Sequence, residues 1–302
     1  MSYRRKHNYQ IKNLEFKDYK GVDFSKYSFN ELKELWRQTL EEGMHGICFS
    51  MYEDGQKPGD TITEKQVERR INILKPYVKW VRSFSCIEGN EHVPKIAKKH
   101  NLNTLVGAWL SDDLDKNEEE IEALIQLGKQ GFIDIAAVGN EVLYRNDLSL
   151  NQLLEYLKRV KEALPNVQVG YVDAYYEFTK HPELAEISDV ILSNCYPFWE
   201  GCHIDYSLNH MQQMYKQAKS AAPHKKVIIT ETGWPNKGGN EGASESTNEN
   251  AIKYYINSQV WASKENIEMF YFSSFDESWK VGDEGDVGAF WGLWDKNEDL
   301  KF

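Results

Sequence analysis

The chain has 302 residues, of which 41% are hydrophobic and 27% charged, and a formal net charge of −11 at pH 7. The acidic charge argues against a nucleic-acid partner, because binding to phosphates requires a basic surface. No apolar run approaches the roughly 18 residues of a membrane-spanning helix.

Residues 1–43 precede the first predicted strand, and we expect them to form an N-terminal extension packed on a single domain, 44–302. The segment "MSYRRKHNYQ" carries positive charge without an apolar stretch after it, so it is not a signal peptide. We therefore expect a cytoplasmic protein if this terminus is native, and an extracellular or periplasmic one if a signal was trimmed. The stretch "SFNELKELWRQTLEEG" predicts a helix over 28–43, capped by Ser28 or Asn30, that leads into or plugs the barrel floor.

Eight short apolar runs follow, each typical of a buried strand. They are residues 45–50, 80–86, 103–110, 133–141, 167–175, 189–196, 226–231 and 267–277. Helical periodicity separates them, and eight strand–helix units in about 260 residues predict a one-domain α/β fold, a (β/α)₈ TIM barrel. A doubly wound open sheet is the alternative, although no Gly-rich phosphate loop occurs.

Three of these runs end in polar groups. They are Asn140 and Glu141 in the fourth run, Glu231 in the seventh, and Asp276 and Glu277 in the eighth, with Lys280 just beyond. Functional side chains of such barrels gather at the carboxyl ends of the strands, so we expect these groups to meet. Two carboxyl groups are what hydrolysis of a glycosidic bond requires, whereas a single strand-end glutamate could equally form a salt bridge.

The motifs "VGNEVL", "ITETGWP", "FDESWK" and "FWGLW" resemble glycoside hydrolase family 17, the β-1,3-glucanase family, over residues 44–302. The last part of the chain is more similar to bacterial and fungal members of the family than to plant members. The resemblance implies a retaining mechanism with Glu231 as nucleophile and Glu141 as acid/base. It also implies that Asn140 binds the sugar 2-hydroxyl beside the cleaved bond.

The resemblance further implies positions that bind sugar around this pair. Tyr196 matches a sugar-contact tyrosine of the family, and Phe84 stands where many relatives have a tyrosine. Glu277 and Lys280 match a Glu-x-x-Lys element, whose ammonium either keeps Glu231 ionised or forms only an ion pair. A further family glutamate has Glu284 as its nearest candidate, at a different spacing. The other candidates near strand ends are Tyr52, Trp109, Asn194, Trp199 and Trp234, with rim packing as the alternative for Tyr52, Trp109 and Trp234.

Several functions remain open for this arrangement. The first is an enzyme that hydrolyses laminarin-like β-1,3-glucan internally. The alternatives are a β-1,3-glucanosyltransferase, an exo-acting glucanase whose 236–250 loop would block one end of the site, and a glucan-binding protein without activity. We expect the partner to be a β-1,3-glucan polysaccharide or oligosaccharide, and the protein to be a monomer without cofactor. We also expect no metal, because its eight histidines form no metal-binding motif.

The four cysteines, Cys48, Cys86, Cys195 and Cys202, show no CxxC spacing. Buried free thiols are the expectation, with a Cys195–Cys202 disulfide as the alternative.

Overall fold

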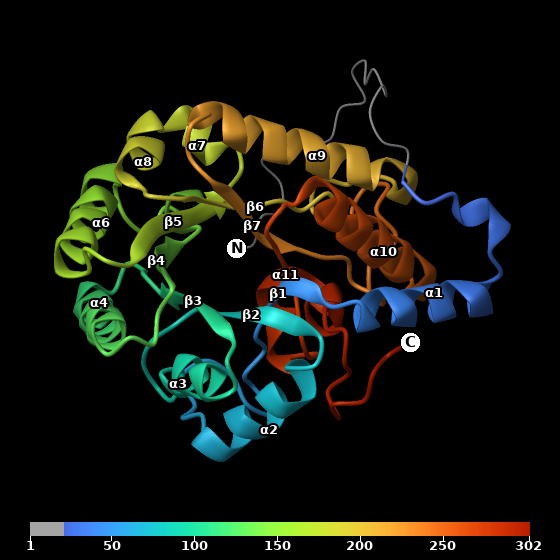
Figure 1. The fold of residues 1–302 in the computed structure, drawn as a ribbon, viewed down its shortest axis with the longest axis horizontal. Coiled ribbons are helices and arrows are strands. Elements are labelled where there is room, and N and C mark those ends of the chain that lie inside the picture. The colour runs from blue at the N-terminus through green and yellow to red at the C-terminus, as the bar shows by residue number, and fades with distance from the viewer. Residues whose placement is uncertain (1–20) are drawn as a thin grey trace.

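The computed structural model describes residues 21–302, whose eight strands close into a parallel barrel in the order of the sequence (Figure 1). The strands are β1 (Met44–Cys48), β2 (Val78–Ser83), β3 (Asn103–Ala108), β4 (Ile135–Asn140), β5 (Gln168–Ala174), β6 (Ile191–Asn194), β7 (Val227–Thr232) and β8 (Met269–Tyr271). Strand β8 pairs with β1 and closes the circle. The predicted (β/α)₈ barrel is confirmed, and the open sheet is excluded.

Helices surround the strands (Figure 1). The α-helices are α1 (Phe29–Glu41), α2 (Glu64–Leu74), α3 (His92–Lys99), α4 (Leu114–Lys129), α5 (Val142–Arg145), α6 (Leu150–Ala163), α7 (Glu177–Lys180), α8 (Pro182–Ile187), α9 (Ile204–Ala221), α10 (Asn248–Glu265) and α11 (Val281–Glu284). Three 3₁₀ segments complete the list: η1 (Phe24–Lys26), η2 (Ser278–Lys280) and η3 (Gly285–Phe290). The longer helices bury one apolar face each, as their periodicity predicts; on α2 this face includes Val67, Ile71 and Leu74.

Helix α1 begins at a complete capping box, in which Ser28 and Glu31 bond each other's backbone N–H groups. The helix leads into β1 and runs beside α10 (Figure 1). Its Trp36 is fully buried, with ring centroids 5.5 Å from Tyr255 of α10 and 5.3 Å from Phe302. Because only short helical segments follow β8 in the described chain, α1 supplies the long helix of that part of the ring.

The eighth strand is much shorter than the predicted 267–277. After Tyr271 the backbone still donates to the barrel, from the Phe272 N–H to the Thr232 carbonyl at 2.8 Å and from the Ser274 N–H to the Cys48 carbonyl at 3.0 Å, but it also bonds to a later segment. The Ser273 N–H donates to the Trp291 carbonyl at 3.1 Å, and the Asp276 N–H to the Trp294 carbonyl at 3.0 Å. This second pairing interrupts the regular ladder of β8, whereas the other strand boundaries shift by a few residues at most.

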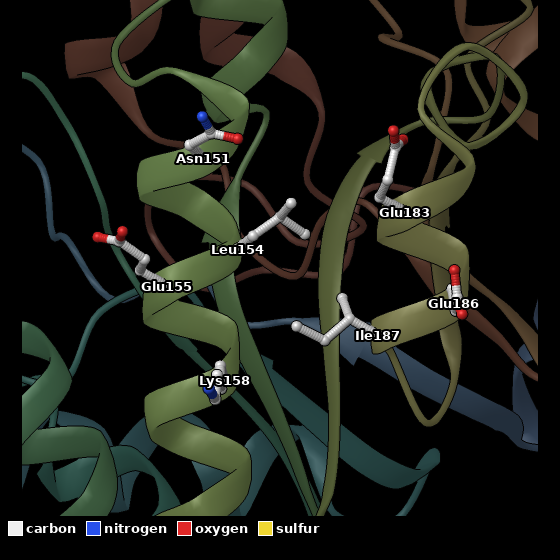
Figure 2. Close-up of a pocket in the computed structure, with 7 residues that line it drawn as sticks. All are labelled: Asn151, Leu154, Glu155, Lys158, Glu183, Glu186 and Ile187. Carbon is white, nitrogen blue, oxygen red and sulfur yellow. The ribbon is translucent and has the colours of Figure 1, made fainter.

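The four cysteines are buried free thiols, as expected. Among residues 21–302, no helix is long and apolar enough to cross a membrane, and no group of three or more potential ligands could hold a metal ion. A groove on the outer wall lies between α6 and α8 (Figure 2). Leu154 and Ile187 face each other across it, and none of the predicted site residues lines it.

Candidate active site

Strand β7 delivers Glu231 to the carboxyl end of the barrel, where three side chains donate to its carboxylate. The Arg82 guanidinium (Nη1) and the Asn194 amide (Nδ2) donate to Oε1 at 2.6 and 3.1 Å, and the Tyr196 hydroxyl donates to Oε2 at 2.8 Å. All of these residues are buried. A group that only accepts hydrogen bonds, from one cation and two neutral donors, is placed to act as an anion.

Arg82 is the residue of this site that the sequence analysis missed. It lies inside β2 with 1% of its surface exposed, and its Nη2 donates to Oδ1 of Asn140 at 2.7 Å. Its guanidinium carbon lies 4.2 Å from the centre of the Phe84 ring. A buried guanidinium must be paired, so an arginine in the middle of the apolar run "WVRSFSC" was the available signal. Arg82 connects the ends of β4 and β7.

Glu141 follows β4 through an irregular backbone. The pairing of β4 with β5 shifts register between Ala137 and Asn140, and Gly139 has φ +85°. A Cβ atom at Gly139 would lie 2.7 Å from Cγ2 of Val142, so the position requires glycine. Glu141 itself adopts a left-handed conformation, with φ 53° and ψ 31°. These features turn its side chain out of the strand and toward β6.

The amide of Asn194 joins the two glutamates. Its Nδ2 donates to Oε1 of Glu141 at 2.9 Å as well as to Oε1 of Glu231 at 3.1 Å. The two acceptor oxygens therefore lie at most about 6 Å apart. Burial and the negative charge of Glu231 raise the pKa of Glu141 to about 7. The site therefore combines a carboxyl group that can give a proton near neutral pH with a second carboxyl group that is held by three hydrogen-bond donors.

Asn140 is held from two sides. Its Oδ1 accepts from Arg82, and its backbone carbonyl accepts from the Arg145 guanidinium. That guanidinium also lies over the ring of Trp109, 4.5 Å from the centroid. Trp109 is 39% exposed, so it can present the rest of its surface to a ligand beside Asn140.

Glu277 and Lys280 form an ion pair of 2.6 Å, and the other Glu277 oxygen accepts from the backbone N–H of Tyr52 at 3.2 Å. Burial alone would lower the pKa of Lys280, but the charges of Glu277, Glu284 and Glu231 raise it above its usual value. Burial raises the pKa of Glu284 to about 7, although the positive charge of Lys280 lowers it in part. The ammonium thus acts on these carboxyl groups as well as on Glu277.

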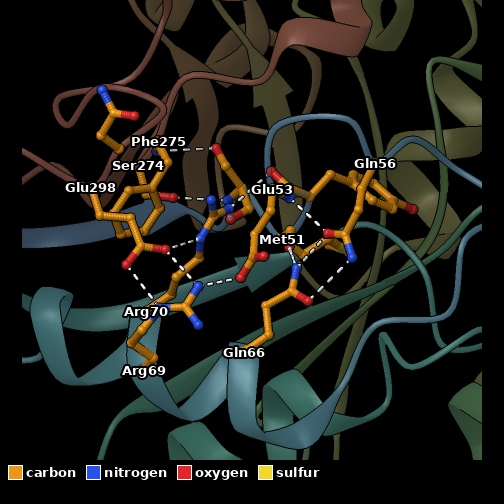
Figure 3. A network of polar contacts seen from close by, with 12 residues as sticks. Met51, Glu53, Gln56, Gln66, Arg69, Arg70, Ser274, Phe275 and Glu298 are labelled. Atoms are coloured by element: carbon orange, nitrogen blue, oxygen red, sulfur yellow. Dashed lines mark hydrogen bonds and ion pairs between the residues drawn. The ribbon is translucent and has the colours of Figure 1, made fainter.

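The loop that carries Tyr52 is fixed by a polar network (Figure 3). Nη1 of Arg70 donates to the carbonyl of Tyr52 at 3.0 Å, and Nε of Arg70 donates to Glu298 near the carboxyl end of the chain at 2.9 Å. The Arg70 guanidinium also lies over the Phe275 ring, 4.6 Å from its centroid. Segments from both ends of the barrel sequence thereby set the position of Tyr52.

Trp234 and Trp199, two of the predicted aromatic sugar contacts, are buried. Trp234 is 1% exposed, and its indole N–H donates to the backbone carbonyl of Glu245 at 2.9 Å. Trp199 is buried against Trp291 at 5.4 Å between ring centroids, and Trp291 in turn packs on Tyr196 at 5.6 Å. Trp234 therefore packs inside the protein in this structure, and the rings of Trp199 and Trp291 lie behind Tyr196.

Asp276 also stands apart from the glutamate pair. Its Oδ1 lies 2.7 Å from the ammonium of Lys301 and accepts from the Gly292 N–H at 2.9 Å. The carboxylate thus anchors the last residues of the chain.

Comparison with known proteins adds independent information. The family model described as the BtgE/BtgC glycoside hydrolase domain matches residues 46–292. A glucan 1,3-beta-glucosidase of Schizosaccharomyces pombe is 28% identical over 252 residues, which cover 76% of this chain and 77% of that protein.

Among solved structures, the glycoside hydrolase family 17 beta-1,3-glucanosyltransferase of Rhizomucor miehei superposes with a TM-score of 0.77. It is 30% identical, and the match covers 86% of this chain and 96% of that one. An active-site mutant of the Rhizomucor miehei beta-1,3-glucanosyltransferase, solved in complex with laminaritriose, matches with the same TM-score at 29% identity, covering the same shares of the two chains.

Proposed function

The chain belongs to the BtgE/BtgC glycoside hydrolase domain family, within glycoside hydrolase family 17, and we propose that it cleaves β-1,3-glucan internally by a retaining mechanism. In this proposal Glu231 is the nucleophile and Glu141 the acid/base. Residues 44–302 form the catalytic barrel, on which the extension with α1 packs, and the protein acts as a monomer. Sedimentation of the full chain tests the monomer.

The observation that carries the mechanism is the amide of Asn194, which bonds both glutamates and so limits their oxygens to about 6 Å apart. Retaining glycosidases hold their two carboxyl groups about 5–5.5 Å apart, whereas inverting enzymes leave about 6.5–9.5 Å for a water molecule. The geometry at Asn194 supports the retaining alternative.

The first step forms a bond between a carboxylate oxygen of Glu231 and the anomeric carbon of the sugar. The bond from that carbon to the glycosidic oxygen breaks, and Glu141 transfers its proton to the leaving oxygen. The raised pKa of Glu141 supplies the protonated form near neutral pH. Arg82 and Tyr196 hold Glu231 in place for the attack.

The second step releases the glycosyl group. Once the ester has formed, Glu231 carries no charge, so the pKa of Glu141 falls and its carboxylate can accept a proton. A water molecule loses that proton to Glu141, its oxygen bonds to the anomeric carbon, and the ester bond to Glu231 breaks. Asn140, whose Oδ1 is occupied by Arg82, would donate from Nδ2 to the sugar 2-hydroxyl.

A transferase is the second candidate, and a specific observation favours it. Both solved structures compared above are described as beta-1,3-glucanosyltransferases, and they match this chain with a TM-score of 0.77. In a transferase a sugar hydroxyl takes the place of water in the second step. Exo-action with the same two glutamates is a third possibility.

A time course on linear β-1,3-gluco-oligosaccharides tests the function. Early products of mixed shorter lengths support an endo-hydrolase, products longer than the substrate indicate transfer, and single sugars released from one end indicate exo-action. Glu231→Gln abolishes turnover in each case. Glu245→Gln is the matched control, because this exposed residue offers only its backbone carbonyl to Trp234. Unchanged substrate with the wild type would refute the β-1,3 assignment.

A further inference from the structure

Two fully buried polar side chains of β5 have no part in the chemistry above. The hydroxyl of Tyr171 donates to Oδ2 of Asp173, whose Oδ1 accepts from the backbone N–H of Ala174 at 2.7 Å. Both residues are 0% exposed. Buried polar groups are kept when their hydrogen bonds fix a particular arrangement, so the question is what this pair holds.

The pair holds the turn that carries Glu141. The Tyr171 hydroxyl accepts from the backbone N–H of Leu143 at 3.0 Å, two residues beyond the glutamate. The neighbouring Val172 carbonyl accepts from the N–H of Glu141 itself at 2.8 Å. Strand β5 thus bonds the turn at two points, on either side of the Glu141 side chain.

Such support is needed because Glu141 has the left-handed backbone conformation that only a few non-glycine residues adopt, with φ 53°. A residue stays in this sparsely populated region only where its surroundings hold it there. The hydroxyl of Tyr171 can accept from Leu143 because its own proton is committed to Asp173.

We propose that Tyr171 and Asp173 are positioning residues for Glu141, which set the direction from which its carboxyl group delivers a proton to the leaving oxygen. This inference rests on the proposed role of Glu141 as acid/base. Tyr171 acts through the backbone of Leu143, and Asp173 acts through Tyr171, so neither residue touches the substrate.

The charges around the pair agree with this role. Burial, together with the charge of Asp173, raises the pKa of Tyr171 well above its usual value, so its hydroxyl keeps the proton that it donates. Burial, together with the charges of Glu141 and of Glu177 on α7, raises the pKa of Asp173.

The experiment compares two substrates that differ in their need for an acid. The sugar released from laminaritriose is a poor alkoxide leaving group and requires proton transfer, whereas the dinitrophenolate of a dinitrophenyl β-laminaribioside departs without it. For Tyr171→Phe we expect kcat/KM to fall about tenfold or more on laminaritriose and by less than about twofold on the aryl glycoside. Because kcat/KM covers only the steps up to ester formation, a defect in the second step leaves this comparison unaffected.

Tyr255→Phe is the matched control, since it removes a buried hydroxyl of α10 that has no hydrogen-bond partner within residues 21–302. We expect this variant to equal the wild type on both substrates. Equal losses of Tyr171→Phe on both substrates, or no loss on either, would overturn the inference.

Asp173→Asn keeps the test open if Tyr171→Phe does not fold, because asparagine replaces one of the two acceptor oxygens, which serve Ala174 and Tyr171 separately, by an NH₂ donor. We expect it to show the same selective loss on laminaritriose. If neither variant folds, the pair belongs to the folding core and the inference is refuted.

Glu141→Gln distinguishes failure of the proposed function from failure of the positioning role. Full activity of this variant on laminaritriose would refute the proposed function itself. An inactive Glu141→Gln together with a Tyr171→Phe of normal activity would refute only the positioning role.

Discussion

Glu141 must be protonated when the first bond breaks, and its surroundings set the pH at which that holds. Burial and the neighbouring charge of Glu231 disfavour its ionised form, which raises its pKa from 4.5 to about 7. The acid form therefore predominates below about pH 7 and is lost as the pH rises through that value. We expect kcat/KM on laminaritriose to fall with a basic limb near pH 7, measured in steady state across the pH range.

The Glu231→Gln variant checks the cause of this limb. Removing the charge of Glu231 should lower the pKa of Glu141, which carbon NMR of a labelled carboxyl group can follow without turnover. An unchanged pKa in this variant would show that the charge of Glu231 has no influence on the basic limb.

The second prediction concerns Arg82, which is the buried cation beside Glu231. Arg82→Met leaves the Glu231 carboxylate without its cation and Asn140 without its donor, so we expect a loss of about 3–5 kcal/mol in the free energy of unfolding as well as loss of activity. Urea unfolding measures the first effect. Arg69→Met is the control, since Arg69 pairs with Glu298 at a half-exposed position and should cost about 1 kcal/mol or less. Equal costs at both positions would contradict the prediction.

Helix α1 packs into the ring as a barrel helix, and Trp36 is the side chain through which this packing can be tested. Trp36→Ala removes a fully buried indole between α10 and Phe302, and the cavity should cost about 3–5 kcal/mol in the free energy of unfolding. Tyr27→Ala removes an aromatic ring of the same segment that is exposed, and we expect a change within about 0.5 kcal/mol. A small effect of Trp36→Ala would show that α1 is only loosely attached to the barrel.

Periodicity predicts the helices and strands well where one element buries one face. The cap of α1 at Ser28 and the strands that end at Asn140 and beside Glu231 follow from local sequence. The end of β8 does not, because the backbone after Tyr271 bonds partly to β7 and β1 and partly to the segment 291–294, which lies later in the chain.

The candidate site likewise contains residues that the sequence predicts and residues that it does not. The strand-end positions of Glu141 and Glu231 can be predicted from patterns and resemblance, but their partners cannot. Arg82 and Glu231 are 149 positions apart in the chain, and no local pattern connects them. The burial of Trp234 is also a property of packing, since the bond to Glu245 and the neighbouring rings appear only in the folded barrel.

The net charge of the molecule bears on which glucan it can approach. With a charge of −11, the protein repels anionic substrates at long range, whereas a neutral β-1,3-glucan experiences no such field. Raising the ionic strength from about 0.01 to 0.15 M shortens the Debye length from about 30 to 8 Å. We therefore expect kcat/KM on neutral laminaritriose to change by less than about twofold over this range.

Laminaritriose oxidised to its aldonic acid is the matched control, because it adds one negative charge to nearly the same molecule. Screening should relieve its repulsion by the protein, so kcat/KM on this acid should rise with salt while the value for the neutral sugar stays level. A steep salt dependence on the neutral sugar itself would mean that charge contributes to substrate binding here. Such a result would redirect the substrate assignment toward a charged polysaccharide.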